Sequence, residues 1–269
     1  MKRIRLLPLV TVLLLCACSA IPVQGEVPEP EKQLPAVPSY VFDVSVHSKQ
    51  FTREDNGELY ASYEYHYPMM RIANLDELSE EDRGIAERNR EAFNALMQQE
   101  LDEAIKFGEE MEKDVDGGFM PLADEKLVTV VRRGQILTVL EQGYYYGGGA
   151  HPFTYTATHT FDLELGQYID PTQVGDDPEF FRRTAAPLLI AYAESLGEEY
   201  VEGFWSDYAE IISRWNEAAV VFDEIGMTVT FSVYELGPYA MGPVQLHLTY
   251  DDIADAIGAG GLERLGVTR

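Results

Sequence analysis

A long segment of helical periodicity, residues 79–113, stands between two groups of segments that alternate with period two, and this arrangement constrains the fold most. Ser79, followed by Glu81 and Asp82, supplies an N-cap for the helix. Strands grouped into hairpins, with helices between the groups, are typical of α+β proteins rather than of alternating parallel βαβ units. We therefore expect an α+β fold with antiparallel sheets, a long helix in the N-terminal part and helices packed on a C-terminal sheet.

The other elements are expected from local patterns. Alternating or β-branched runs predict strands at residues 40–46, 59–67, 126–131, 135–140, 153–165, 219–223, 227–232 and 244–250. Pro68 is expected to end the second strand, and Arg133-Gly134 is expected to join the third and fourth in a hairpin. Amphipathic patterns predict helices at residues 178–196, 207–216 and 251–257.

The N-terminus has the pattern of an export leader. Lys2, Arg3 and Arg5 precede an apolar run, residues 6–15, which is far shorter than the roughly 20 residues of a membrane-spanning helix. Small residues then stand before Cys18, the arrangement that a lipoprotein signal peptidase requires. We expect Cys18 to carry a lipid that anchors the chain to a membrane in a bacterial cell envelope, outside the cytoplasmic membrane. A plain secretory signal with an incidental cysteine is the alternative.

These features divide the chain into four parts. Residues 1–17 are expected to be the lipoprotein signal peptide, and residues 18–39, rich in proline and glutamate, the lipidated cysteine and a tether. Residues 40–120 are expected to form an N-terminal subdomain and residues 121–269 a C-terminal domain. Because Cys16 leaves with the leader and Cys18 carries the lipid, no free thiol remains for a disulfide, a nucleophile or a metal site.

The charge balance is strongly acidic. The chain has 20 Lys and Arg against 46 Asp and Glu, a formal net charge of −26. This charge disfavours nucleic acid as a partner and favours cationic proteins, peptides or metal ions. Acidity that merely keeps an extracellular protein soluble is the alternative.

No catalytic motif is evident in the sequence. There is no HExxH, serine nucleophile elbow, Walker loop, dinucleotide fingerprint or complete calcium loop, so we assign no catalytic residue, metal or cofactor. Only His151 lies in a glycine-rich loop, and with Glu235 or Asp162 it is the candidate for an enzymatic alternative. The other four histidines fall in expected strands, where a local hydrogen bond is favoured over metal ligation. They are His47, His66, His159 and His247.

Two glycine-bracketed segments are candidates for a recognition surface. Residues 144–169 begin with three tyrosines and three glycines, and residues 231–250 hold a tyrosine between two Gly-Pro pairs. Tyrosine offers a flat apolar face and a hydroxyl, which suits recognition. The alternative is structural, with the first tyrosines packed in the core, Glu235 capping turn amides and Tyr239 filling a gap. The candidate ligand-binding residues are Tyr144, Tyr145, Tyr146, Gly148, Gly149, His151, Tyr234, Glu235 and Tyr239.

Motifs in these two segments carry a family resemblance. The first combines Tyr146 and the GGAH sequence of residues 148–151 with Phe161-Asp162 and Gly166, and the second is YELGPYA at residues 234–240 followed by Gly242. They resemble the extracellular domain of the anti-sigma-V lysozyme receptors, the RsiV-like proteins, and the non-catalytic part of PdaC-type peptidoglycan deacetylases. Residues 63–70 and the helix after them, with an asparagine such as Asn89 or Asn94, resemble that family's N-terminal portion. The resemblance covers about residues 40–257.

The resemblance implies an α+β fold and, in the receptors, binding of lysozyme without catalysis. Neither a sigma-binding segment with a spanning helix nor the deacetylase catalytic motifs are evident, so we expect neither activity. We expect a cell-envelope lipoprotein that is a non-catalytic binding module for a wall-directed protein such as lysozyme, or for peptidoglycan. An enzyme or accessory subunit in peptidoglycan modification, and a purely structural envelope lipoprotein, are the alternatives.

Overall fold

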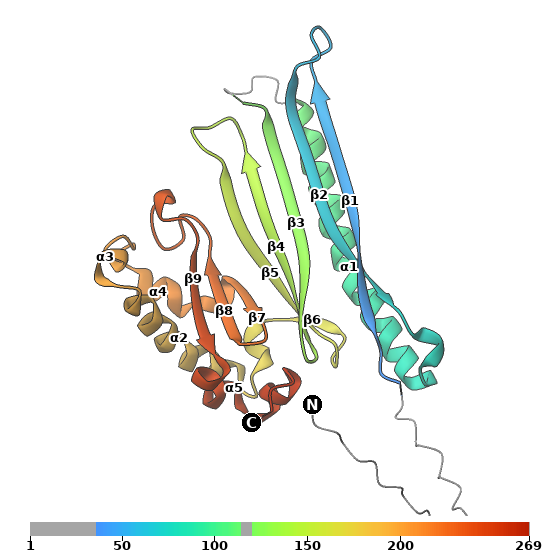
Figure 1. Cartoon of the computed structure of the whole chain (residues 1–269), viewed down its shortest axis with the longest axis vertical. Helices are drawn as coiled ribbons and strands as arrows, with labels where there is room; N and C mark the ends of the chain where they lie inside the picture. Colours follow the sequence, from blue (N-terminus) through green and yellow to red (C-terminus); the bar gives the residue numbers. More distant parts are fainter. Residues whose placement is uncertain (1–35, 114–119, 269) are drawn as a thin grey trace, which may run out of the picture. The chain divides into compact units, whose positions relative to one another are not determined.

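The computed structural model describes residues 36–113 and 120–268, which contain two sheets with helices packed against them (Figure 1). The α+β class expected from the sequence is therefore confirmed. The first sheet has the strand order β1-β2-β3-β4-β5-β6, and the second has the order β7-β8-β9. The strands are β1 (Tyr40–Thr52), β2 (Leu59–Ile72), β3 (Leu122–Arg133), β4 (Ile136–Tyr146), β5 (Phe153–Asp162), β6 (Gln167–Ile169), β7 (Ala219–Phe222), β8 (Gly226–Phe231) and β9 (Val244–Thr249). The α-helices are α1 (Glu80–Glu110), α2 (Pro178–Ser195), α3 (Glu198–Val201), α4 (Tyr208–Ser213) and α5 (Tyr250–Arg264).

The first sheet is mixed rather than purely antiparallel. Strands β2 and β3 pair in parallel, while the other pairs of both sheets are antiparallel. Parallel neighbours need a long crossover connection, and α1 lies in the segment between these two strands. The expected portions 40–120 and 121–269 thus contribute strands to one sheet, and residues 36–269 group as one compact unit.

Strand β2 continues through Pro68, so the expectation that this proline ends the strand is wrong. Pro68 pairs with Val44 of β1, and the pairing of β2 with β3 stops at His66. Beyond His66 this edge of β2 pairs with no other strand among the described residues, and a missing proline N–H is tolerated at such an edge.

Helix α1 covers one face of the strands β1 and β2 (Figure 1). Its N-cap is the expected one, because the Ser79 hydroxyl accepts a hydrogen bond from the Asp82 amide at 3.1 Å. Phe93, Met97 and Leu101 project from α1 into the first core, where they are almost fully buried. This apolar stripe fixes the helix on the sheet.

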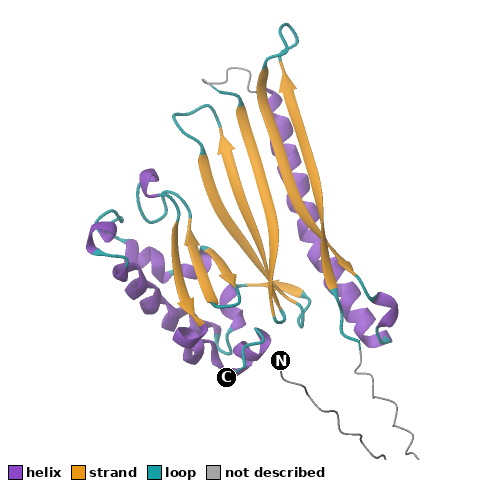
Figure 2. Cartoon of the chain, viewed as in Figure 1, coloured by secondary structure: helices purple, strands orange, loops and turns teal. Residues whose placement is uncertain are grey.

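The second core lies under the sheet of β7, β8 and β9, against which α2 and α5 pack (Figure 2). Asp177 caps α2 by accepting from the Phe180 amide at 3.0 Å. Arg264 at the end of α5 forms an ion pair with the fully buried Asp162 at the end of β5. Asp162 also accepts from the backbone amides of Glu164 and Leu165, so it is a structural residue of the β5–β6 turn.

Strand β5 also contacts the second sheet through side-chain hydroxyls. The Ser232 hydroxyl accepts from the Thr156 amide at 3.0 Å, and the Thr158 hydroxyl accepts from the Val220 amide at 2.8 Å. Polar side chains thus connect strand β5 to the segments that hold the second candidate loop.

Among residues 36–113 and 120–268, no helix combines the length and apolar character needed to cross a membrane.

Candidate functional site

The two segments selected from the sequence meet in space. The hydroxyl of Tyr234 and Nε2 of His151 form a hydrogen bond of 3.0 Å, although the residues lie 83 positions apart. The His151 ring stacks on the Tyr239 ring with centroids 3.8 Å apart, and Tyr234 and Tyr239 have centroids 5.7 Å apart. We call these three residues the aromatic cluster. His151 and Tyr234 are exposed and Tyr239 is half-buried, so the cluster presents ring surface to solvent.

Hydrogen bonds set the orientation of the His151 ring. Nδ1 lies 3.0 Å from the carbonyl oxygen of Pro152, and a carbonyl can only accept, so Nδ1 carries a proton. In the neutral ring this leaves Nε2 to accept from the Tyr234 hydroxyl. Both ring nitrogens are therefore engaged within the loop pair, and the ring face remains the surface available for contact.

Tyr234 has an unfavourable backbone conformation. Its φ angle is +71°, the only positive value at a non-glycine position among the described residues. This region is costly for a bulky side chain, and such strain clusters at functional sites. The Tyr234 carbonyl accepts from Trp205 Nε1 at 3.1 Å, which helps to hold the turn. In this conformation the Tyr234 hydroxyl reaches His151.

The Glu235 side chain does not belong to the aromatic cluster. Its carboxylate accepts from the Ser232 amide at 2.6 Å, so it caps the turn as the structural alternative expected. Although the residue is exposed as a whole, the carboxyl group folds back on the chain, and this desolvation raises its pKa. It lines a different hollow, with Arg214 and Phe231, and the structure does not bring it to the aromatic cluster.

The three tyrosines belong to the end of strand β4 and alternate across the sheet. Tyr146 is only 3% exposed, and its hydroxyl donates to the carbonyl of Gly149 at 3.0 Å. Tyr145 packs on Phe107 of α1, with ring centroids 5.7 Å apart. Tyr144 lies on the face away from α1. Gly148, with φ +87°, and Gly149 belong to the β4–β5 connection that carries His151.

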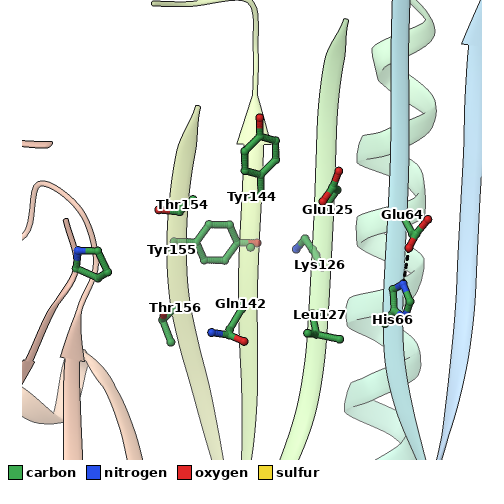
Figure 3. Close-up of a pocket in the computed structure, with 12 residues that line it drawn as sticks. Glu64, His66, Glu125, Lys126, Leu127, Gln142, Tyr144, Thr154, Tyr155 and Thr156 are labelled. Carbon is green, nitrogen blue, oxygen red and sulfur yellow. Dashed lines mark hydrogen bonds and ion pairs between the residues drawn. The ribbon is translucent and has the colours of Figure 1, made fainter. Parts of the chain in front are cut away.

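A groove of about 510 Å³ crosses the face of β2, β3, β4 and β5 to which Tyr144 contributes (Figure 3). Pro243, which follows the aromatic-cluster loop, also lines it, so both selected segments border one groove. Its remaining lining comes largely from alternate residues of these strands. They are Glu64, His66, Glu125, Lys126, Leu127, Gln142, Gly143, Thr154, Tyr155 and Thr156.

Several polar groups in the groove are open to a ligand. The side chains of Gln142, Tyr144 and Thr154 make no hydrogen bond to another residue in the described ranges, whereas His66 bonds Glu64 at 2.7 Å. The sequence reasoning missed Gln142 and Thr154, because a polar residue on a strand usually just faces solvent. The available signal was alternation, which places Gln142 on the same face as Tyr144.

Three of the four other histidines make the contacts within their own sheet that were expected: His47 bonds Ser45, His66 bonds Glu64, and His247 bonds Thr228 of the neighbouring strand. The expectation is wrong for His159, which pairs with Glu100 of the distant helix α1 at 2.7 Å. This pairing raises the pKa of His159. Cys18, the expected lipidation site, lies outside the described residues.

The fold and the site together define an α+β domain with a groove on one face of its first sheet and an exposed aromatic cluster, His151, Tyr234 and Tyr239, in two of its loops. Residues 199–251 match the family described as "Protein of unknown function (DUF3298)", and this segment contains Tyr234, Glu235 and Tyr239. No curated protein matches the chain.

Two solved structures share the fold. A DUF3298 family member from Bacteroides fragilis is 18% identical, with 86% of this chain and 97% of that chain covered at a TM-score of 0.59. A DUF3298 family protein from Pseudomonas aeruginosa is 13% identical, with 84% of this chain and 97% of that chain covered at a TM-score of 0.52. At these identities the similarity shows the fold alone.

Proposed function

We propose that this chain is a non-catalytic binding module that engages a cationic, wall-directed protein, represented by lysozyme, through the aromatic cluster and the adjoining groove. The observation that carries the proposal is the exposed cluster in which His151 stacks on Tyr239 and hydrogen-bonds the strained Tyr234. A cluster of rings at the surface has the composition of an interface hot spot. The RsiV-like resemblance of the same residues supports the same ligand class.

Electrostatics supports a cationic partner. The chain carries a formal net charge of −26, and the groove is lined by Glu64 and Glu125, whereas Lys126, which also lines it, is paired with Glu141. Such a field accelerates the encounter with a cationic protein and is screened by salt. The aromatic cluster then supplies the contact that salt does not remove.

The test is binding of hen lysozyme to the purified chain in an interferometry assay at rising ionic strength. Tyr239→Ala should weaken binding by about tenfold or more, because it removes the stacked ring of a hot spot. Phe180→Ala, which removes an exposed ring on α2, is the matched control and should bind like the unaltered chain. No retention of lysozyme even at low salt would rule out this ligand.

Peptidoglycan is a second candidate, favoured by one observation. The amide of Gln142 and the hydroxyls of Tyr144 and Thr154 have no hydrogen-bond partner within residues 36–113 and 120–268, and they line the groove together with the ring of Tyr155. Free polar groups beside an aromatic ring suit a sugar chain. Co-sedimentation with purified cell walls tests it, and Gln142→Ala should lower the bound fraction. A turnover assay on wall fragments separates a binder from an enzyme, since a binder leaves the fragments unchanged.

We further propose that the module is held at the envelope by a lipid on Cys18. The basic, apolar and small-residue parts of residues 1–18 support this proposal. Cys18→Ala should move the expressed chain from the membrane fraction to the soluble fraction and abolish incorporation of labelled fatty acid. Retention of the label in that variant contradicts the anchor.

A further inference from the structure

A second cleft, distinct from the groove, lies on the face of the first sheet that α1 covers. It has a volume of about 480 Å³, and its walls come from α1 on one side and from β2, β3, β4 and β5 on the other. Tyr145 lines this cleft while Tyr144 lines the groove, because neighbouring strand residues point to opposite faces. The two cavities are therefore separate binding spaces built on the same strands.

The charges in this cleft are unbalanced toward negative. Glu100 pairs with His159 at 2.7 Å, and Glu141 pairs with Lys126 at 3.2 Å. Two further carboxylates, those of Glu103 and Asp124, line the same space.

Asp124 lies deepest among these carboxylates. It is only 3% exposed, and its burial raises the pKa of its carboxyl group, even though the Tyr65 hydroxyl donates to it at 2.6 Å. Burial therefore makes its negative charge costly, and a bound cation would offset that cost.

Carboxylates alone would form only a solvated acidic surface, but this cleft also has aromatic walls. Phe107 and Tyr145 have ring centroids 5.7 Å apart, and Phe153 and Tyr155 have centroids 6.1 Å apart at an interplanar angle of 25°. Phe107 is 46% exposed and Phe153 is 39% exposed, so apolar ring surface is left uncovered at this site. Exposed rings beside a hollow mark a place where a ligand can bury them.

The Glu141 carboxylate is fixed in position within the cleft. The hydroxyl of Tyr155 donates to one of its oxygens at 2.6 Å, and the hydroxyl of Tyr67 donates to the other at 3.1 Å. These two hydrogen bonds fix the orientation of the Glu141 carboxylate. A prearranged carboxylate loses little freedom when a cation binds, which favours affinity.

We propose that the cleft between α1 and the first sheet binds an organic ammonium group that carries an apolar body. The ammonium lies at Asp124, near the paired carboxylates Glu100 and Glu141, where it offsets the excess negative charge of Asp124 and Glu103. The rings of Phe107 and Phe153 cover the apolar body. The faces of aromatic rings attract cations, and carboxylates form ion pairs with cations. The aromatic walls and the carboxylates of the cleft therefore select the same ligand. The cleft does not depend on the aromatic cluster and is a site of its own.

Calorimetric titration of the full chain with 2-phenylethylamine, and with 2-phenylethanol as the neutral analogue of the same shape, tests this proposal. We expect the amine to bind about tenfold more tightly than the alcohol, the factor that one charge interaction of 1.4 kcal/mol supplies. Equal affinities, or an amine affinity weaker than about 10 mM, would overturn the proposal.

Variants locate the site. Phe153→Ala should weaken the amine about fivefold and Asp124→Asn about tenfold, whereas Tyr239→Ala in the aromatic cluster should leave it unchanged. If Asp124→Asn fails to fold, as judged by circular dichroism, Phe153→Ala decides alone, because its side chain is exposed. Unchanged affinity in Phe153→Ala places the amine elsewhere and refutes the assignment.

Discussion

Replacing Tyr234 by glycine and, separately, by alanine divides the contribution of this residue into a backbone part and a side-chain part. Its φ of +71° is unfavourable for any residue with a Cβ, at a cost of about 1–2 kcal/mol. The side chain offsets part of this through the hydrogen bond to His151, which is exposed and contributes about 0.5–1 kcal/mol. Alanine loses the contacts and keeps the strain, whereas glycine loses the contacts and relieves it.

We therefore expect Tyr234→Gly to be more stable than Tyr234→Ala by about 1 kcal/mol and to lie close to the unaltered chain. Urea unfolding followed by circular dichroism measures the difference as a shift in midpoint at constant slope. Gly57→Ala calibrates the backbone part, since Gly57 also has φ +71° and an added Cβ meets no atom within 4 Å. It should cost about 1 kcal/mol as well, because the same two residues are compared at the same φ.

Both Tyr234 variants should lose lysozyme binding to the same extent, because both remove the ring. The glycine variant should therefore recover stability without recovering lysozyme binding. This is the result expected if the strained backbone is retained because it serves binding. If Tyr234→Ala is as stable as Tyr234→Gly while Gly57→Ala shows its full cost, the backbone at Tyr234 is not strained and the reasoning fails.

Three further predictions follow from the described contacts. Asp162→Ala should destabilise the fold by about 3–5 kcal/mol in urea unfolding, because it removes the counterion of Arg264 and the acceptor of two backbone amides; a loss under about 1 kcal/mol contradicts this. Glu100 raises the pKa of His159 in the folded state above its ordinary value of 6.5, so this pair stabilises the fold fully below that pH and ceases to do so as pH rises through the folded pKa. Glu100→Gln should therefore differ most from the unaltered chain in thermal unfolding near about pH 6, and a gap that widens toward alkaline pH would reverse the assigned sign. Gly143→Ala should cost about 1–3 kcal/mol, because an added Cβ overlaps the Tyr155 ring, and an unchanged unfolding midpoint would show that this ring moves freely.

The sequence predicted those features that depend on neighbours along the chain. The grouping of periodicities predicts the α+β class, and Ser79 predicts the start of α1, because capping involves only the next three residues. The end of β2 was mispredicted, because whether Pro68 is tolerated depends on where the distant strand β3 stops pairing.

The candidate site was predictable to the extent that unusual residues mark it. Glycines and tyrosines selected His151, Tyr234 and Tyr239, and the structure brings these three together. The groove residue Gln142 and the cleft residue Asp124 carry no such mark, since one polar residue on a strand, or one acid among 46 Asp and Glu, resembles any other. Only the register of strands β2 to β5 places them beside their partners.

The pairing of Asp162 with Arg264 has a consequence for synthesis. Asp162 leaves the ribosome about a hundred residues before its counterion, and the amide of Gln135 likewise awaits the carbonyl of Arg264, to which it donates at 2.7 Å. Before Arg264 is present, burying the Asp162 carboxylate would desolvate a charge that has no ion-pair partner. This cost disfavours the packing of the β5–β6 turn into the fold. We expect the nascent chain to stay loosely assembled until α5 has been synthesised and docks.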